Sequence, residues 1–177
     1  MIIDINELRE RGEPLLVEAD FTESQLRIRT ETASLANPAH ARLKVSLSGE
    51  RVRVTGHVSA ELEIACSRCL KPVGFGVDNN VDLEYWPDPE VEKEGEEISL
   101  SYDELSIGFY RDDRLDLSGV ISEQIVLEIP MKPVCDAACQ GLCPQCGADL
   151  NETACACEPV TSDHRWDALL DLRKKLK

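Results

Sequence analysis

The sequence predicts an α+β protein in which an antiparallel β-meander or small barrel carries a cysteine-rich appendage and a C-terminal helix. Two observations predict this class. Several segments of the first half alternate apolar and polar side chains with period two, which is typical of strands with one buried face. In addition, six of the eight cysteines lie within residues 131–160, and the residues after them place apolar side chains at helical spacing.

The first predicted elements are short. Residues 4–12 predict a helix that ends at Gly12, because glycine readily adopts the left-handed conformation that follows many helices. Residues 25–30 predict a strand, since Leu26 and Ile28 alternate there with arginines.

Three longer strands follow. Residues 41–49 alternate regularly, and residues 51–66 carry the longest alternating run of the chain, which Gly56 interrupts as a candidate bulge or bend. Residues 73–86 continue the pattern after a turn. Strands joined in this order by short turns predict an antiparallel meander that could curl into a small barrel.

The second half is less regular. Residues 88–105 hold eight carboxylates and a single lysine, which is typical of a solvated loop. Residues 118–129 predict a helix with Ser118 as its N-cap, and Pro130 ends it.

These elements predict three parts of the chain. Residues 1–130 form the β core with its acidic loop and helix, and residues 131–160 form a Cys-rich segment. Residues 161–177 form an amphipathic helix whose basic end suits a helix C-terminus.

The cysteines predict a metal site. The first residues carry charges and lack the apolar run of a signal peptide, so we expect a cytoplasmic protein in a reducing compartment. No stretch is apolar for long enough to predict a membrane span. Two Cys-x2-Cys turns can each present two thiolates to one zinc ion, which favours tetrahedral sulfur ligands. The candidate zinc ligands are all eight cysteines: Cys66, Cys69, Cys135, Cys139, Cys143, Cys146, Cys155 and Cys157.

The pairing of these cysteines stays open at this point. We predict that Cys143, Cys146 and Cys157 share one ion, whose fourth ligand is Cys155, Cys139 or Cys135. If the fourth ligand is Cys155, the four remaining cysteines could form a second site. Because sulfur ligands are available for every corner, such sites would be closed and structural rather than catalytic.

Two charged surfaces are candidates for partner binding. The acidic segment over residues 88–105 is either a solvated loop or a surface that attracts a basic partner, and with a formal net charge of −15 the chain would repel a long phosphate backbone. Basic side chains nevertheless lie on the outward positions of neighbouring predicted strands, where they are either a solvated face or a patch for RNA phosphates. These residues are Arg27, Arg29, Arg42, Lys44, Arg51 and Arg53.

Several motifs resemble one known family. The run Cys66-Ser-Arg-Cys69-Leu70 after a long strand resembles the CxRCL element of the YceD family, the large ribosomal RNA accumulation proteins. The segments 130–135, 141–151 and 155–157, together with Asp163-His-Arg-Trp166, are similar to its zinc-cluster variant. The resemblance covers essentially the whole chain.

The resemblance implies a ribosome-biogenesis factor that supports accumulation of large-subunit (23S) ribosomal RNA. We expect it to be non-catalytic, with structural zinc, because no phosphate loop or catalytic motif is present. The expected partner is a basic ribosomal protein or the large-subunit rRNA precursor, and neither a membrane nor a small-molecule substrate is expected. The alternatives are direct binding of precursor rRNA through the basic strands and an RNA-processing enzyme.

Overall fold

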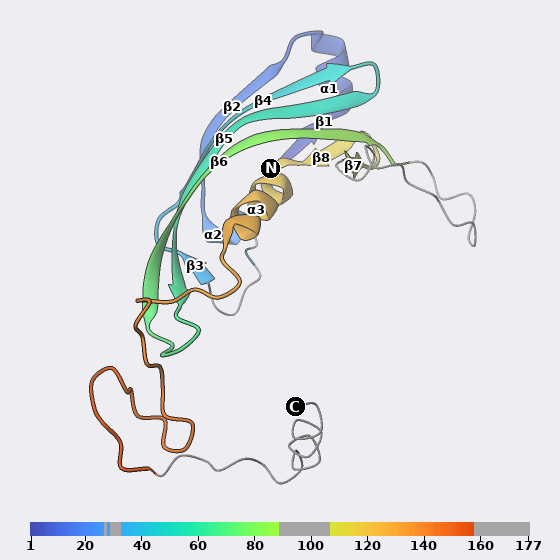
Figure 1. Ribbon diagram of the computed structural model, residues 1–177. Coiled ribbons are helices and arrows are strands. Elements are labelled where there is room, and N and C mark those ends of the chain that lie inside the picture. The colour runs from blue at the N-terminus through green and yellow to red at the C-terminus, as the bar shows by residue number, and fades with distance from the viewer. Residues whose placement is uncertain (27, 29–32, 89–106, 158–177) are drawn as a thin grey trace, which may run out of the picture.

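The computed structural model describes residues 1–26, 28, 33–88 and 107–157. Within these residues the chain forms one large curved sheet, one small sheet and three helices, followed by a cysteine-rich segment (Figure 1). The predicted α+β class is therefore confirmed. The predicted C-terminal helix over residues 161–177 and nearly all of the acidic segment lie outside the described residues.

The large sheet has the strand order β2-β4-β5-β6-β7, and β3 pairs with β5 beside the end of β4. Its pairs are antiparallel except for β6 and β7, which are parallel. No ladder within the described residues joins β2 to β7, so the sheet is an open arch and the predicted alternative of a closed barrel is wrong. The strands are β2 (Leu15–Phe21), β3 (Ala33–Leu35), β4 (Ala39–Ser48), β5 (Arg51–Ala65), β6 (Pro72–Pro87) and β7 (Ile107–Tyr110).

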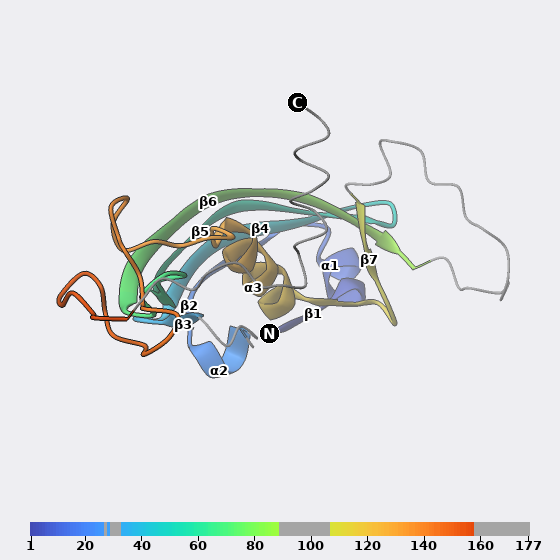
Figure 2. The ribbon, with the colours of Figure 1, turned by 60° about the horizontal axis from the view of Figure 1, so that its bottom comes forward.

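The remaining elements lie under the arch or close its end. Figure 2 shows α3 on the concave side of the sheet, with α1 and α2 nearby. A short antiparallel pair joins the first strand to the one before α3. These elements are β1 (Ile2–Asp4), α1 (Ile5–Arg11), α2 (Glu23–Leu26), β8 (Arg114–Asp116) and α3 (Leu117–Glu128).

The hydrophobic core lies between the concave face and α3. Val54, Val58 and Leu62 of β5 point into it, and Ile121 and Ile125 of α3 are fully buried against the same cluster. Each such side chain contributes about 1.5–3 kcal/mol when it leaves water. Burial of one strand face explains why the alternation in β4, β5 and β6 predicted these strands correctly.

Two helices differ from the sequence-based predictions. Gln25 and Leu26, which were predicted to begin a strand, belong to α2. The predicted helix over residues 118–129 is present as α3, but its N-cap is Asp116 rather than Ser118. The buried Ser118 hydroxyl instead accepts a hydrogen bond from the amine of Met1. The predicted first helix is confirmed as α1, and the left-handed Gly12 donates to the carbonyl of Leu8.

Gly56 allows close contact at the centre of the arch. Its φ is +150°, which non-glycine residues rarely adopt, and a Cβ added there would lie 2.1 Å from the carbonyl oxygen of Arg42 on β4. The glycine that interrupts the longest alternating run is therefore required for β4 and β5 to pair at this point.

We expect Gly56→Ala to lower the free energy of unfolding by about 3 kcal/mol or more, because the strained φ and the clash of the added methyl group with β4 both destabilise the sheet. Urea unfolding at fixed zinc concentration measures this change. Gly76→Ala is the matched control, since an added Cβ on β6 meets no atom within 4 Å. Equal losses in the two variants would contradict this explanation of Gly56.

Candidate metal centres

The structure brings the eight cysteines into two groups of four. In each group, the four sulfur atoms lie within 4.8 Å of one another. Group 1 consists of Cys66, Cys69, Cys135 and Cys139, and group 2 consists of Cys143, Cys146, Cys155 and Cys157. This is the division expected when Cys155 completes the C-terminal group, one of the alternatives that the sequence left open.

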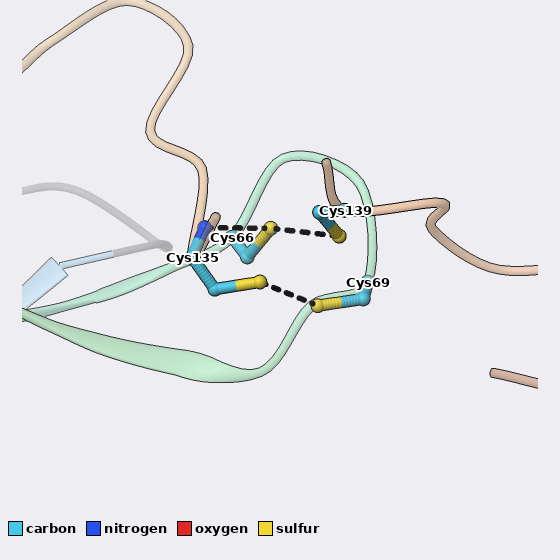
Figure 3. Close-up of side chains that lie close together, drawn as sticks. All are labelled: Cys66, Cys69, Cys135 and Cys139. Atoms are coloured by element: carbon cyan, nitrogen blue, oxygen red, sulfur yellow. Dashed lines mark hydrogen bonds between the residues drawn. The ribbon is translucent and has the colours of Figure 1, made fainter. Parts of the chain in front are cut away.

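Group 1 joins two distant parts of the chain. Cys66 follows the last residue of β5, and Cys69 lies in the turn that leads to β6. Cys135 and Cys139 come from the segment after α3, and Figure 3 shows the four side chains pointing toward one another. Cys135 is exposed, and the other three are at most 5 % exposed.

The sulfur spacing in group 1 fits a tetrahedral ion. Four sulfurs at 2.3 Å from zinc would be about 3.8 Å apart. The Cys69 and Cys135 sulfurs are 3.6 Å apart, and those of Cys66 and Cys139 are 4.0 Å apart. None of the eight cysteines forms a disulfide. These residues could therefore hold a metal ion such as zinc.

The two Cys-x2-Cys turns have the same backbone geometry. In the first, the N–H of Cys66 donates to the carbonyl of Lys71 at 2.8 Å, and the N–H of Leu70 donates to the carbonyl of Cys66 at 2.9 Å. In the second, the N–H of Cys143 donates to the carbonyl of Ala148 at 2.8 Å, and the N–H of Gly147 donates to the carbonyl of Cys143 at 2.9 Å. The fifth residue of each turn has a positive φ.

That fifth residue differs between the turns. Gly147, with φ of +73°, suits the left-handed conformation, whereas Leu70 adopts φ of +61° although leucine rarely does. The Leu70 side chain is 65 % exposed, so no burial compensates for this conformation. The turn geometry around Cys66 and Cys69 is therefore imposed by its hydrogen bonds.

Backbone N–H groups prepare one sulfur of each group to be a thiolate. The N–H groups of Cys69 and Arg68 lower the pKa of Cys66 to about 6, and those of Cys146 and Gln145 lower the pKa of Cys143 to about 6. Hydrogen bonds to neighbouring thiolates raise the pKa of Cys135 to about 12, since a second negative charge is unfavourable there. Metal ligands must lose their protons, so each group begins with one favourable site.

Group 2 lies at the surface. Cys143 is buried, Cys146 is exposed, and Cys155 and Cys157 are intermediate. Its residues come from a single stretch, 143–157, that also contains Asn151. The side-chain amide of Asn151 donates to the sulfur of Cys139 in group 1 at 3.5 Å. The cysteine spacing did not reveal this contact.

Several of the basic side chains on the outward strand positions form ion pairs with carboxylates. A guanidinium nitrogen of Arg42 lies 2.6 Å from a carboxylate oxygen of Glu18, and the guanidinium of Arg53 donates two hydrogen bonds of 2.8 Å to the carboxylate of Asp82. These contacts lower the pKa of both carboxyl groups.

The other basic residues of this predicted face have weaker contacts or lie outside the described residues. Arg51 lies 3.7 Å from Glu84 and 4.2 Å above the Trp86 ring. Lys44 is exposed on β4. Arg27 and Arg29 lie outside the described residues.

The family follows from a comparison with family models. Residues 54–173 match the model described as large ribosomal RNA subunit accumulation protein YceD. The chain belongs to the YceD family. That family is linked by its name to accumulation of the large ribosomal RNA subunit.

Several known proteins are similar to this chain, and two of those from plants carry the name of the same family. An uncharacterised protein of Mycobacterium tuberculosis is 34% identical over 176 residues, which cover 97% of this chain and 81% of that protein. In Arabidopsis thaliana, the chloroplastic large ribosomal RNA subunit accumulation protein YCED homolog 1 is 26% identical over 160 residues. That match covers 79% of this chain and 50% of the plant protein.

A Zea mays protein with the same name is 33% identical over 133 residues, covering 62% of this chain and 45% of that protein. No solved structure matches the chain significantly. None of the helices in the described part of the chain is long and apolar enough to span a membrane.

We expect protein purified under reducing conditions to contain about two zinc ions per chain, because each four-sulfur group matches one tetrahedral ion. Metal analysis by mass spectrometry measures the content. Cys143→Ser/Cys146→Ser should lower it to about one ion, while Ser122→Ala on α3 should leave it unchanged. A content below about half an ion per chain would contradict the metal assignment.

Proposed function

We propose that this chain is a non-catalytic cytoplasmic factor that supports the accumulation of large-subunit (23S) ribosomal RNA, with two structural zinc ions. The family match over residues 54–173 supports the role in rRNA accumulation. The all-sulfur composition of both cysteine groups supports a structural role for the metal, because a catalytic zinc ion keeps an open position. An RNA-processing role would need such a position.

We further propose a basic ribosomal protein as the direct partner. The net charge of −15 supports this choice, since an acidic chain attracts basic partners and repels a phosphate backbone. The outer face of the arch gives further support. There Arg42 and Arg53 are each paired with a carboxylate on a neighbouring strand, which leaves less positive charge for phosphates.

Direct binding of precursor rRNA is the second candidate. Lys44 is exposed on the outer face. Arg51 lies over the Trp86 ring, an arrangement in which a guanidinium and an aromatic plane could both contact a base. This surface therefore defines a variant that separates the two candidates.

We expect loss of the gene in the host organism to lower large-subunit rRNA relative to small-subunit rRNA, and wild-type protein to restore it. Lys44→Gln/Arg51→Gln/Arg53→Gln should restore it equally, because a protein partner of basic character does not need these charges. Quantification of the two rRNAs measures the effect. Rescue by wild type alone would favour direct RNA binding instead.

We also expect the purified chain to retain a ribosomal protein in a pull-down, and the yield to fall as salt rises through about 0.15–0.5 M, where screening shortens the reach of charges. Mass spectrometry of the eluate identifies the protein. An eluate without any salt-sensitive ribosomal protein would contradict the proposed partner.

A further inference from the structure

The two cysteine groups are joined by more than the chain between them. Group 1 ends at Cys139 and group 2 begins at Cys143, so only three residues separate the nearest ligands. Three sets of side-chain and backbone contacts bridge the same gap. They come from Arg68 and Lys71 in the first turn and from Asn151 in the stretch that carries group 2.

Arg68 supports the connecting segment from both ends. Its guanidinium donates to the carbonyl of Cys139 at 2.7 Å and to that of Ala137 at 3.2 Å. Its own carbonyl accepts from the N–H of Leu142 at 3.1 Å. The segment lies so close that a Cβ on Gly141 would be 2.9 Å from this carbonyl oxygen, and Gly141 also has φ of +76°.

Lys71 joins the Cys66–Cys69 turn to residues 143–157, which carry group 2, by two ion pairs. Its ammonium lies 2.8 Å from a carboxylate oxygen of Asp149 and 2.5 Å from one of Glu152. The Asp149 side chain is only 15% exposed. Both acids lie between Cys146 and Cys155, so the ion pairs hold the loop that separates the two halves of group 2.

Asn151 lies in the loop of group 2 and contacts a ligand of group 1. Its side-chain nitrogen donates to the Cys139 sulfur at 3.5 Å, and its side-chain oxygen accepts from the backbone N–H of Gln140 at 2.7 Å. A hydrogen bond to a sulfur that carries negative charge stabilises the thiolate and orients it. A residue of the group 2 loop therefore contributes to the surroundings of a group 1 ligand.

We propose that Lys71 and Asn151 are positioning residues that couple the two groups, so that a metal ion in one group strengthens metal binding in the other. This inference rests on the proposed zinc content. An ion in group 1 orders the Cys135–Cys139 segment against Arg68, and the loop of group 2 then docks on a surface that is already fixed. The ordering entropy is thus lost once rather than twice, which is positive coupling.

The two groups are anchored to the sheet in different ways. Cys66 and Cys69 lie at the end of the paired β5–β6 hairpin, which fixes half of group 1 without metal. All four ligands of group 2 lie in residues 143–157. This stretch contacts the hairpin through the ion pairs of Lys71, and the residues just before it contact Arg68. Group 1 is therefore anchored directly on the hairpin, and group 2 is anchored through these contacts.

Cobalt(II) titration of the full chain tests the coupling, because tetrahedral thiolate sites give visible cobalt bands whose intensity reports occupancy. Cys66→Ser/Cys69→Ser should weaken cobalt binding by group 2 about tenfold or more, within the usual range for coupled sites. Because coupling is reciprocal, Cys143→Ser/Cys146→Ser should weaken group 1 by the same factor.

A second set of variants keeps all eight cysteines. Lys71→Met should reduce the coupling about two- to fivefold, the range for an exposed ion pair, and Lys71→Arg should retain it. Asn151→Leu should also reduce the coupling while the tetrahedral cobalt bands remain. Lys44→Met on β4 is the control lysine, and it should leave the coupling at the wild-type value.

The outcomes separate the two proposals. Two bound cobalt ions whose coupling is the same in wild type, Lys71→Met and Asn151→Leu would overturn the proposal and leave the zinc assignment intact. A wild-type chain that binds no cobalt would contradict both. Weaker coupling in Lys71→Met and Asn151→Leu, with retention of the wild-type value in Lys71→Arg, supports the proposal.

Discussion

The β5–β6 ladder is the constraint on which the other parts depend. It pairs residues continuously from Val52 with Tyr85 to Ala65 with Pro72. Its concave face supplies core residues from Val52 to Ile64, some of which pack on α3, and its turn presents Cys66 and Cys69. A single hairpin therefore positions both the hydrophobic core, which runs along its concave face, and the first cysteine group, which lies at its turn (Figure 1).

The outer face of the arch shows how an acidic chain carries many arginines. Each paired arginine on β4 and β5 faces a carboxylate on the adjacent strand, so these pairs add little net charge to the sheet. Exposed pairs of this kind contribute only about 0.2–1 kcal/mol each, and so their main effect is on the electric field that a partner meets.

Sequence patterns predicted much of the sheet because one face of each strand is buried. The strand β2 was nevertheless missed, although Val17 and Phe21 alternate with polar residues and are buried. The helix α2 was also missed. Its signal was the Thr22-x-x-Gln25 capping box, in which the Gln25 side chain accepts from the Thr22 N–H at 2.8 Å.

The cysteine groups show the limit of local patterns. Spacing predicted the two Cys-x2-Cys turns, because each is closed by hydrogen bonds within six residues. The grouping depends on a segment after α3 returning to a turn more than sixty residues earlier, and no short pattern encodes that return. Likewise, Asn151 became recognisable only once its amide was seen beside the Cys139 sulfur.

Val73 marks the boundary between two separate clusters of buried side chains. It packs against the main core and against the small cluster of Cys66, Cys69 and Cys139, whereas the main core includes no buried residue from the cysteine-rich segment. Substitutions that erode the cysteines would thus cost the arch little. The cysteine-bearing tip of the hairpin could therefore unfold or lose its metal while the sheet and α3 stay packed.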